Sequence, residues 1–221
     1  MQKYSVFSLI KNAFSNHQNW EVAWKDPTPK SEYDVVIIGG GGHGLATAYY
    51  LAKEHNIRNV AIIEKGWIGG GNVGRNTTII RSNFMYDANA RFNEFGMDLW
   101  RNLSQELNFN VMFSPRGIIN LAHSDAQMNA YARRGNSMRL NGIDAKLLDR
   151  DEVKKLIPMA DFSDEVRFPI FGGLMQPSAG TARHDAVAWG YARQADDMGV
   201  DIIQHCEVTG FDVVNGKIKG I

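Results

Sequence analysis

The chain of 221 residues is 44% hydrophobic and 22% charged, which is typical of a soluble globular protein with one large domain or two small ones. Its 24 basic and 24 acidic residues balance, so the net charge gives no electrostatic basis for binding nucleic acid or a membrane surface. The one cysteine, Cys206, excludes an intrachain disulfide, and no apolar run approaches the ~20 residues of a membrane-spanning helix. We therefore expect a cytoplasmic protein.

Residues 1–32 precede the first predicted strand and are expected to form an N-terminal arm. Apolar residues between positions 7 and 14 have the spacing of one face of a short helix, Trp20 and Trp24 follow, and the proline-rich run DPTPK (26–30) predicts a linker. The apolar run VFSLI is too short for a signal peptide. Two interpretations stay open: the arm packs on the domain surface, or it docks on a partner subunit.

The next stretch, YDVVIIGGGGHGLATAYYLAKEHNIRNVAIIEK (33–65), predicts a strand–helix–strand unit. Val35–Ile38 is an apolar, β-branched run and is expected to be a strand buried on both faces. Leu45–Lys53 has helical spacing, and Val60–Ile63 predicts a second buried strand. A G-x-G-x-x-G motif lies between the first strand and the helix, and an acid closes the second strand, as in dinucleotide-binding βαβ units.

Each position of this motif has a physical task. Gly39 makes the turn out of the strand, Gly41 lets a pyrophosphate approach the backbone, and Gly44 lets the helix pack closely on the strand. The pyrophosphate then meets free N–H groups at the helix N-terminus. Glu64 can accept hydrogen bonds from both ribose hydroxyls and would repel a 2′-phosphate. The motif therefore predicts a dinucleotide without that phosphate.

A second glycine-rich segment, residues 66–81, follows the second strand directly. It lies at the same edge of the sheet as the first glycine loop, where ligands bind in such sheets. Asn76, Thr77 and Thr78 add hydrogen-bonding groups. The alternative is a flexible surface loop.

The rest of the chain alternates helices and short strands. Asp87–Leu107 predicts an amphipathic helix with Phe92, Phe95, Leu99 and Leu103 on one side, and Asp125–Leu140 a helix whose arginines 133, 134 and 139 form a solvated face. A capping box predicts a short helix after Asp149. Other predicted elements are strands over 117–122, 168–175, 200–203 and 207–214, an extended segment over 145–148, a helix over 185–198 and a hairpin turn at 215–216.

We expect residues 33–82 and 177–221 to form the dinucleotide-binding domain, with 200–203 as its third parallel strand. Residues 83–176 are then an inserted segment that contributes a second layer.

Four long segments resemble the amine-oxidising flavoproteins of the D-amino acid oxidase class, and within it the β subunits of heterotetrameric sarcosine oxidases. They are residues 33–83, FSPRGIINLAHSDAQ (113–127), NGIDAKLLDRDEV (141–153) and QPSAGTARHDAVAWGYARQADDMGVDIIQ (176–204). The resemblance covers essentially the whole chain, including the arm. Because the family's β subunit is markedly longer, we expect this chain to be a truncated, N-terminal part.

The resemblance implies a fold, an activity and partners. The fold is α/β, a Rossmann-like FAD-binding βαβ domain of the glutathione-reductase/D-amino acid oxidase type, with part of an antiparallel-sheet substrate domain. Such enzymes oxidise sarcosine (N-methylglycine), or a similar small N-methyl amine, to glycine, and give H2O2 and formaldehyde or methylenetetrahydrofolate. Noncovalent FAD accepts the electrons and passes them to covalent FMN and then to O2. The β subunit assembles with α, γ and δ subunits.

The resemblance also assigns residues. Those carried over as FAD ligands are Gly39, Gly41, Gly42, His43, Gly44, Glu64, Lys65, Val73, Thr77, Ile79 and Val208. His184 falls at the position of covalent FMN attachment, and Arg183 beside it can balance the FMN phosphate or the reduced-flavin anion. Arg81 falls where related oxidases pair an arginine with the substrate carboxylate. The alternative for Arg81 is a structural salt bridge.

Two other functions stay open. One is a single-flavin dehydrogenase of dimethylglycine or an amino acid, which would not need FMN. The other is an inactive FAD-binding fragment that acts only in subunit assembly. No histidine spacing or Ser-His-Asp pattern indicates a metal site or nucleophilic catalysis.

Overall fold

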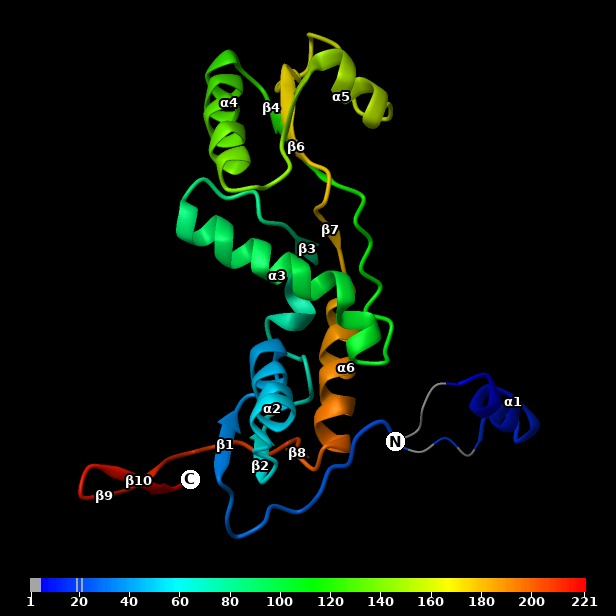
Figure 1. Ribbon diagram of the computed structural model, residues 1–221, viewed down its shortest axis with the longest axis vertical. Coiled ribbons are helices and arrows are strands. Elements are labelled where there is room, and N and C mark those ends of the chain that lie inside the picture. The colour runs from blue at the N-terminus through cyan, green and yellow to red at the C-terminus, as the bar shows by residue number, and fades with distance from the viewer. Residues whose placement is uncertain (1–4, 19, 21) are drawn as a thin grey trace. The chain divides into compact units, whose positions relative to one another are not determined.

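The computed structural model describes residues 5–18, 20 and 22–221, so six positions of the predicted arm lie outside the described residues. Its contacts divide the chain into two compact units (Figure 1). The first, here called the glycine-loop unit, comprises the described residues of 1–77 with 105–111 and 183–221. The second, here called the inserted unit, comprises 78–104 and 112–182. The domain boundaries given above from the sequence remain a prediction.

The glycine-loop unit is built on a parallel sheet in the order β1-β2-β8. Strand β1 is Val35–Ile38, β2 is Val60–Ile63 and β8 is Asp201–Ile203. Val35 pairs with Val60, and Ala61 pairs with Asp201. The prediction of a third parallel strand from 200–203 is therefore confirmed.

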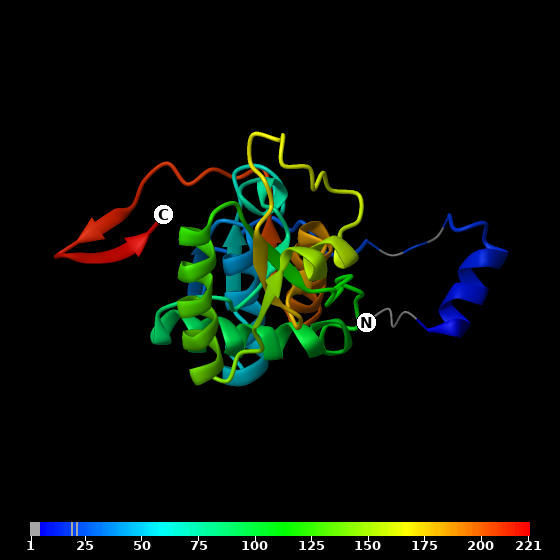
Figure 2. The same ribbon diagram turned by 90° about the horizontal axis from the view of Figure 1, so that it is seen from above.

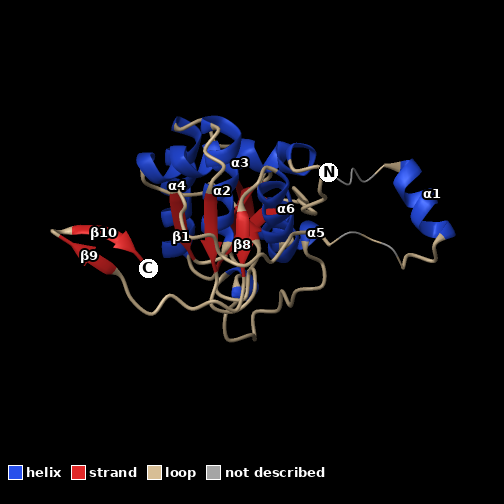
Figure 3. Cartoon of the chain, turned by 90° about the horizontal axis from the view of Figure 1, so that it is seen from below, coloured by secondary structure: helices blue, strands red, loops and turns tan. Residues whose placement is uncertain are grey.

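Two helices, α2 (Gly42–His55) and α6 (His184–Asp197), lie along one face of this sheet (Figure 3). Small and apolar side chains fill the space between helices and strands, among them Leu45 and Ala48 of α2 and Ala192 of α6, each 0% exposed. Their close packing fixes the two helix N-termini at the carboxyl edge of the sheet.

The remaining elements of this unit lie outside the parallel sheet. In the described residues they are α1 (Val6–Phe14), a 3-10 turn η1 (Val73–Arg75), and a hairpin of β9 (Asp212–Val214) and β10 (Lys217–Gly220). The hairpin leaves the sheet on an extended connection (Figure 2). Phe7 and Phe14 of α1 are 83% and 90% exposed, while the following linker is tied to the unit by the Lys30–Asp201 ion pair at 2.7 Å. Both interpretations of the arm stay open.

Strand β1 differs from its prediction. All four residues of β2 are buried, but Val36 and Ile38 of β1 are 37% and 53% exposed, so β1 is not buried on both faces. Among the described residues β1 is an edge strand, and the helices cover only the face that bears Val35 and Ile37. A local apolar run cannot tell an edge strand from a central one.

The inserted unit contains an antiparallel sheet in the order β4-β6-β5 and a short antiparallel pair β3-β7. The strands are β3 (Ile79–Ile80), β4 (Ile118–Ala122), β5 (Lys146–Asp149), β6 (Gly172–Gln176) and β7 (Gly180–Thr181). The helices are α3 (Asp87–Glu106, whose last two residues belong to the glycine-loop unit), α4 (Asp125–Leu140) and α5 (Arg150–Leu156). The predicted antiparallel sheet is confirmed, and so is the capping box between Asp149 and Glu152.

Some details of the inserted unit correct the predictions. Phe92 and Phe95 of α3 are 76% and 64% exposed, and α3 instead buries Ala90, Met97 and Leu103. The buried face of α3 therefore differs from the predicted one, which contained Phe92 and Phe95. Strand β6 begins four positions later than predicted, and the strand predicted over 207–214 is shortened to β9. No helix within the described part of the chain has the length and apolar character to cross a membrane.

Replacing Gly44 with alanine should destabilise the protein, because the added Cβ would lie 2.1 Å from the carbonyl oxygen of Gly39. Such overpacking costs about 1–3 kcal/mol or more, so we expect a clear fall in melting temperature. Gly96→Ala in α3 is the matched control, since its Cβ meets nothing within 4 Å and should stabilise the helix by about 0.5–1 kcal/mol. Equal melting temperatures for the two variants would contradict the close approach of α2 to the first loop.

Candidate functional site

The first glycine loop turns directly from β1 into α2. Gly39 has φ +108°, in the region that favours glycine, and its N–H donates to the carbonyl oxygen of Ile63 at 2.8 Å. Gly41 is the N-cap of α2 and provides no side-chain cap, which leaves the N–H groups of the first turn available to a ligand. A Cβ on Gly41 would come no closer than 3.9 Å to Val73, so the space beside this position is open.

Glu64 joins the two glycine loops. Its Oε2 accepts the Gly40 N–H at 2.7 Å and its Oε1 accepts the Gly66 N–H at 2.8 Å. A second link runs between the loops, because the Gly69 N–H donates to the Gly40 carbonyl at 3.0 Å. Each carboxylate oxygen can accept more than one hydrogen bond, so Glu64 retains capacity for hydroxyl donors.

A cavity of about 720 Å³ lies at the carboxyl ends of β1 and β2. It brings together five of the residues that the sequence assigns to the cofactor: Gly39, Gly41, Glu64, Lys65 and Val208. Val208 reaches it because the Cys206 N–H donates to the Glu64 carbonyl at 3.0 Å and draws this segment to the edge of the sheet. The volume lies in the range of small-molecule and cofactor sites.

The other predicted cofactor residues do not line this cavity. Gly42 and Gly44 lie in the first turn of α2, His43 is exposed there, and Val73 and Thr77 lie further along the second loop. Ile79 and Arg81 belong to the inserted unit.

The cavity is also lined by residues that sequence reasoning did not assign to the cofactor, among them Trp67, Arg75 and Glu207. Trp67 is 64% exposed, although an indole is usually buried. Two basic side chains line this cavity: Lys65, which precedes the second glycine-rich segment, and Arg75, which lies within it. A basic residue in a loop that follows the acid-bearing strand is a signal that could have been used, since a pyrophosphate needs compensating charge. Together the residues present fit a dinucleotide with a free ribose.

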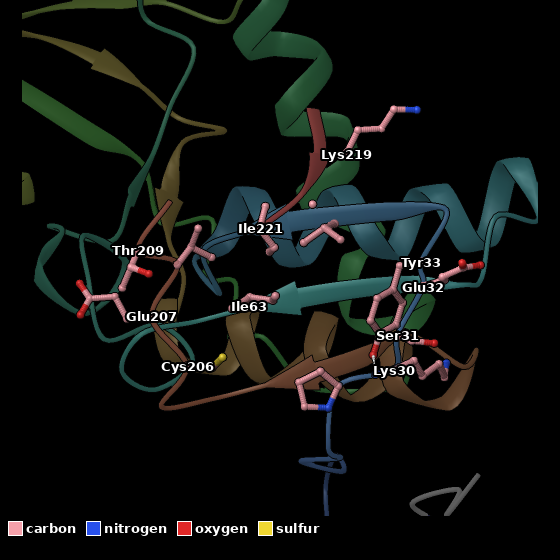
Figure 4. A pocket seen from close by; sticks show the side chains of 14 residues that line it. Lys30, Ser31, Glu32, Tyr33, Ile63, Cys206, Glu207, Thr209, Lys219 and Ile221 are labelled. Atoms are coloured by element: carbon pink, nitrogen blue, oxygen red, sulfur yellow. Dashed lines mark hydrogen bonds between the residues drawn. The ribbon is translucent and has the colours of Figure 1, made fainter. Parts of the chain in front are cut away.

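A second cavity of about 610 Å³ lies on the open face of the same sheet (Figure 4). Tyr33, Ile63, Cys206 and the chain-terminal Ile221 point into it (Figure 4). It contains none of the assigned residues except Val208. No group of three or more metal-ligating side chains occurs among the residues that were placed.

His184 begins α6, in the glycine-loop unit. Its Nδ1 is buried and has no hydrogen-bond partner. Arg183 precedes it as the N-cap, and its guanidinium donates to the Asp185 carboxylate at 2.9 Å from Nε. This hydrogen bond holds the pKa of Asp185 below its usual value. Arg183 is therefore already paired with an acid on its own helix.

Arg81 follows β3 and has no acidic partner among the described residues. Its Nη1 donates to Asn83 Oδ1, and its guanidinium lies 4.8 Å from the centre of the Phe84 ring. The structural salt bridge considered as the alternative is thus not found in the part of the chain that is described.

One predicted solvated arginine is instead part of this cluster. Arg134 of α4 is half-buried and donates from Nε to the backbone oxygen of Asn83 at 2.7 Å. Burial lowers the pKa of Arg134, and the neighbouring Arg81 charge lowers it further. The prediction of a solvated face holds for Arg133 and Arg139, which are exposed, and is wrong for Arg134.

Comparison with known proteins gives consistent matches. The profile of the family DAO, FAD dependent oxidoreductase, matches residues 34–221. Sarcosine oxidase subunit beta from Rhizobium meliloti is 60% identical over 99% of this chain and 52% of its own length, and that from Rhodobacter capsulatus is 52% identical over 100% and 53%. The crystal structure of L-proline dehydrogenase from P. horikoshii has a TM-score of 0.78 at 29% identity, over 86% of this chain and 49% of that one. The chain spans about half the length of these curated relatives.

Glu64→Gln should weaken FAD binding. The amide keeps one acceptor oxygen but turns an NH2 group towards a backbone N–H, and it removes the charge that strengthens these hydrogen bonds. We expect the Kd for FAD, measured by fluorescence titration of the full-length protein, to rise at least about tenfold. Glu32→Gln, in the second cavity, is the control and should leave the Kd unchanged. An unaltered Kd for Glu64→Gln would remove Glu64 from the cofactor site.

Proposed function

This chain belongs to the DAO family of FAD-dependent oxidoreductases, and from that premise we propose that it forms the FAD-binding part of a β subunit that oxidises sarcosine. The observation that carries the proposal is the cavity at the carboxyl edge of the sheet, in which the glycine loop, Glu64 and Arg75 converge. The 60% identity with a protein named sarcosine oxidase subunit beta supports the substrate.

The proposed overall reaction consumes sarcosine and O2, together with water when the product is formaldehyde or tetrahydrofolate when it is methylenetetrahydrofolate. The N-methyl carbon loses two electrons and a proton, and water then releases it as formaldehyde, or tetrahydrofolate takes it up as methylenetetrahydrofolate, leaving glycine. FAD held by the glycine-loop unit would supply the acceptor of the electron pair, and FMN held at His184 would supply the relay to O2, which gains two electrons and two protons to become H2O2.

The glycine-loop unit would hold FAD by complementary groups. The uncapped N–H groups at the start of α2, including those of Gly42 and His43, would bind the pyrophosphate, and Arg75 would balance its charge. Glu64 would accept hydrogen bonds from the ribose hydroxyls. Val208 would contact the adenine through its main chain, and Lys65, Val73 and Thr77 of the same unit would line the remainder.

We assign covalent FMN attachment to His184. A ring nitrogen must offer its lone pair to form the bond, and neither nitrogen of His184 is engaged in a hydrogen bond with a described residue. Because Nδ1 is enclosed, Nε2 is the nitrogen that remains accessible to FMN. Arg183 would balance the FMN phosphate, in competition with Asp185.

We assign Arg81 to the carboxylate of sarcosine. A guanidinium has five N–H donors in a planar fork, and the single hydrogen bond to Asn83 leaves enough of them to bind a carboxylate through two bonds. Among the described residues Arg81 forms no ion pair, which supports a ligand role.

We propose that the partners of the complex are α, γ and δ subunits. The single cysteine supports a cytoplasmic location.

A single-flavin dehydrogenase is the second candidate, and the 29% identity with L-proline dehydrogenase favours it. It would use the same FAD cavity but would not require FMN. Flavin analysis of the denatured full-length protein separates the two functions. The oxidase should release FAD and retain FMN on the chain, whereas the dehydrogenase should carry no FMN.

Replacing His184 with alanine should abolish covalent flavin attachment, since the side chain that forms the bond is lost. We expect acid-precipitated His184→Ala protein, coexpressed with its partner subunits, to carry no flavin, while FAD is still released into the supernatant. Replacement of the exposed His205 by alanine is the control and should retain covalent flavin. Flavin that stays with precipitated His184→Ala protein would contradict the assignment.

Arg81→Ala should impair the binding of an amine that carries a carboxylate. We expect the KM for sarcosine to rise by about 100-fold, in line with the loss of a charge-assisted bidentate pair, with a smaller effect on kcat. The KM for sarcosinamide, in which the carboxylate is replaced by a neutral amide, should change little. If the two KM values rise equally, Arg81 does not bind the carboxylate.

A further inference from the structure

Asn83 of the inserted unit connects two arginines. It is 0% exposed, its side-chain Oδ1 accepts from Arg81 Nη1, and its backbone oxygen accepts from Arg134 through both Nε (2.7 Å) and Nη2. One buried, neutral residue therefore fixes two guanidinium groups that come from distant parts of the sequence, the segment after β3 and helix α4.

The orientation of the Asn83 amide is itself fixed. Its Nδ2 donates to Asn120 Oδ1 at 2.7 Å, and Asn120 lies in β4, paired with Leu174 of β6. The Asn83 amide oxygen must then face Arg81. If the amide were rotated by 180°, its NH2 group would face the Arg81 guanidinium and its oxygen would face Asn120 Oδ1, so that both hydrogen bonds would be lost. Arg81 is in this way connected to the antiparallel sheet through two asparagines.

The two positive charges have no counter-ion within the described residues. The carboxylate of Glu94 accepts a hydrogen bond from the Ser82 hydroxyl, next to Arg81 in the chain. Its ion pair, however, is with Arg101 at 3.6 Å and not with Arg81 or Arg134. The pKa of Arg134 is lowered by burial and by the charge of Arg81, which is the response expected of two like charges without an anion. Partly buried charges of this kind are costly unless an anion joins them.

We propose that Arg134 is a positioning residue of an anion site whose ligand-binding group is Arg81. Arg134 holds the backbone of Asn83, and Asn83 holds the Arg81 guanidinium, while the second positive charge strengthens attraction for an incoming carboxylate. The inference rests on the proposed function in taking the sarcosine carboxylate as the anion. Arg134 does not itself touch that carboxylate.

The test compares Arg134→Gln and Arg134→Lys with Arg133→Gln in the full-length β subunit coexpressed with its partner subunits. Arg133 is adjacent on α4 and exposed, so it controls for a lost charge on the same helix. We expect Arg134→Gln to raise the KM for sarcosine about tenfold with kcat changed less than about twofold, and Arg133→Gln to leave both unchanged. Arg134→Lys, which keeps the charge but not the two-pronged contact, should raise KM by an intermediate factor. The KM for sarcosinamide should not respond.

Equal KM values for sarcosine in Arg134→Gln and Arg133→Gln would overturn the inference while leaving the role of Arg81 intact. A KM that rises equally for sarcosine and sarcosinamide would show a purely structural role and would also overturn it. If Arg134→Gln does not fold, the result for Arg134→Lys tests the inference alone. An unchanged KM for sarcosine in Arg134→Lys would show that Arg134 does not position the Arg81 guanidinium.

Failure of the proposed function would be seen separately, as wild-type enzyme that does not oxidise sarcosine. The anion site is then tested with acetate, whose Kd is read from the change in the absorbance of bound FAD or from the rise in melting temperature. Acetate binding that is about tenfold tighter in wild type than in Arg134→Gln supports the site. Equal affinity in the two proteins overturns it.

Discussion

The glycine-loop unit depends on the carboxylate of Glu64. It follows β2 and accepts one backbone N–H from each glycine loop, so that one side chain, together with the Gly69–Gly40 backbone hydrogen bond, joins the two segments that border the larger cavity. The close approach of Gly44 to the Gly39 carbonyl then fixes where α2 begins. Without the acid, two buried or half-buried N–H groups would lose their acceptor, and the loops would lose the geometry on which the proposed pyrophosphate binding relies.

The two proposed anion sites use different physical means. In the glycine-loop unit, backbone N–H groups at the start of α2 add the positive end of the helix dipole to the charges of Lys65 and Arg75 beside the cavity. In the inserted unit, two guanidinium groups converge on buried Asn83, and the positive charge is concentrated in side chains. Backbone groups suit a large, extended phosphate ligand, whereas a planar guanidinium suits a small carboxylate.

Local patterns of the sequence were sufficient for the βαβ unit, because the turn at Gly39, the packing at Gly44 and the acid at Glu64 follow one another along the chain. The same holds for the capping box at Asp149. The predictions that were wrong concern features that depend on residues far apart in the sequence. The exposed face of β1 and the buried face of α3 are set by which elements lie against them. Arg134 is half-buried because the segment around Asn83 lies against α4. Arg75 reaches the cavity through the folding of a loop that has no periodic pattern.

Anaerobic addition of sarcosine to the full-length protein, coexpressed with its partner subunits and loaded with FAD, tests the central claim most directly. The proposed function predicts that the oxidised flavin absorbance disappears on addition of sarcosine and returns when O2 is admitted, with one glycine formed for each electron pair. Flavin that remains bound and fully oxidised in the presence of saturating sarcosine would contradict it. The protein would then be an FAD-binding subunit without sarcosine-oxidising activity.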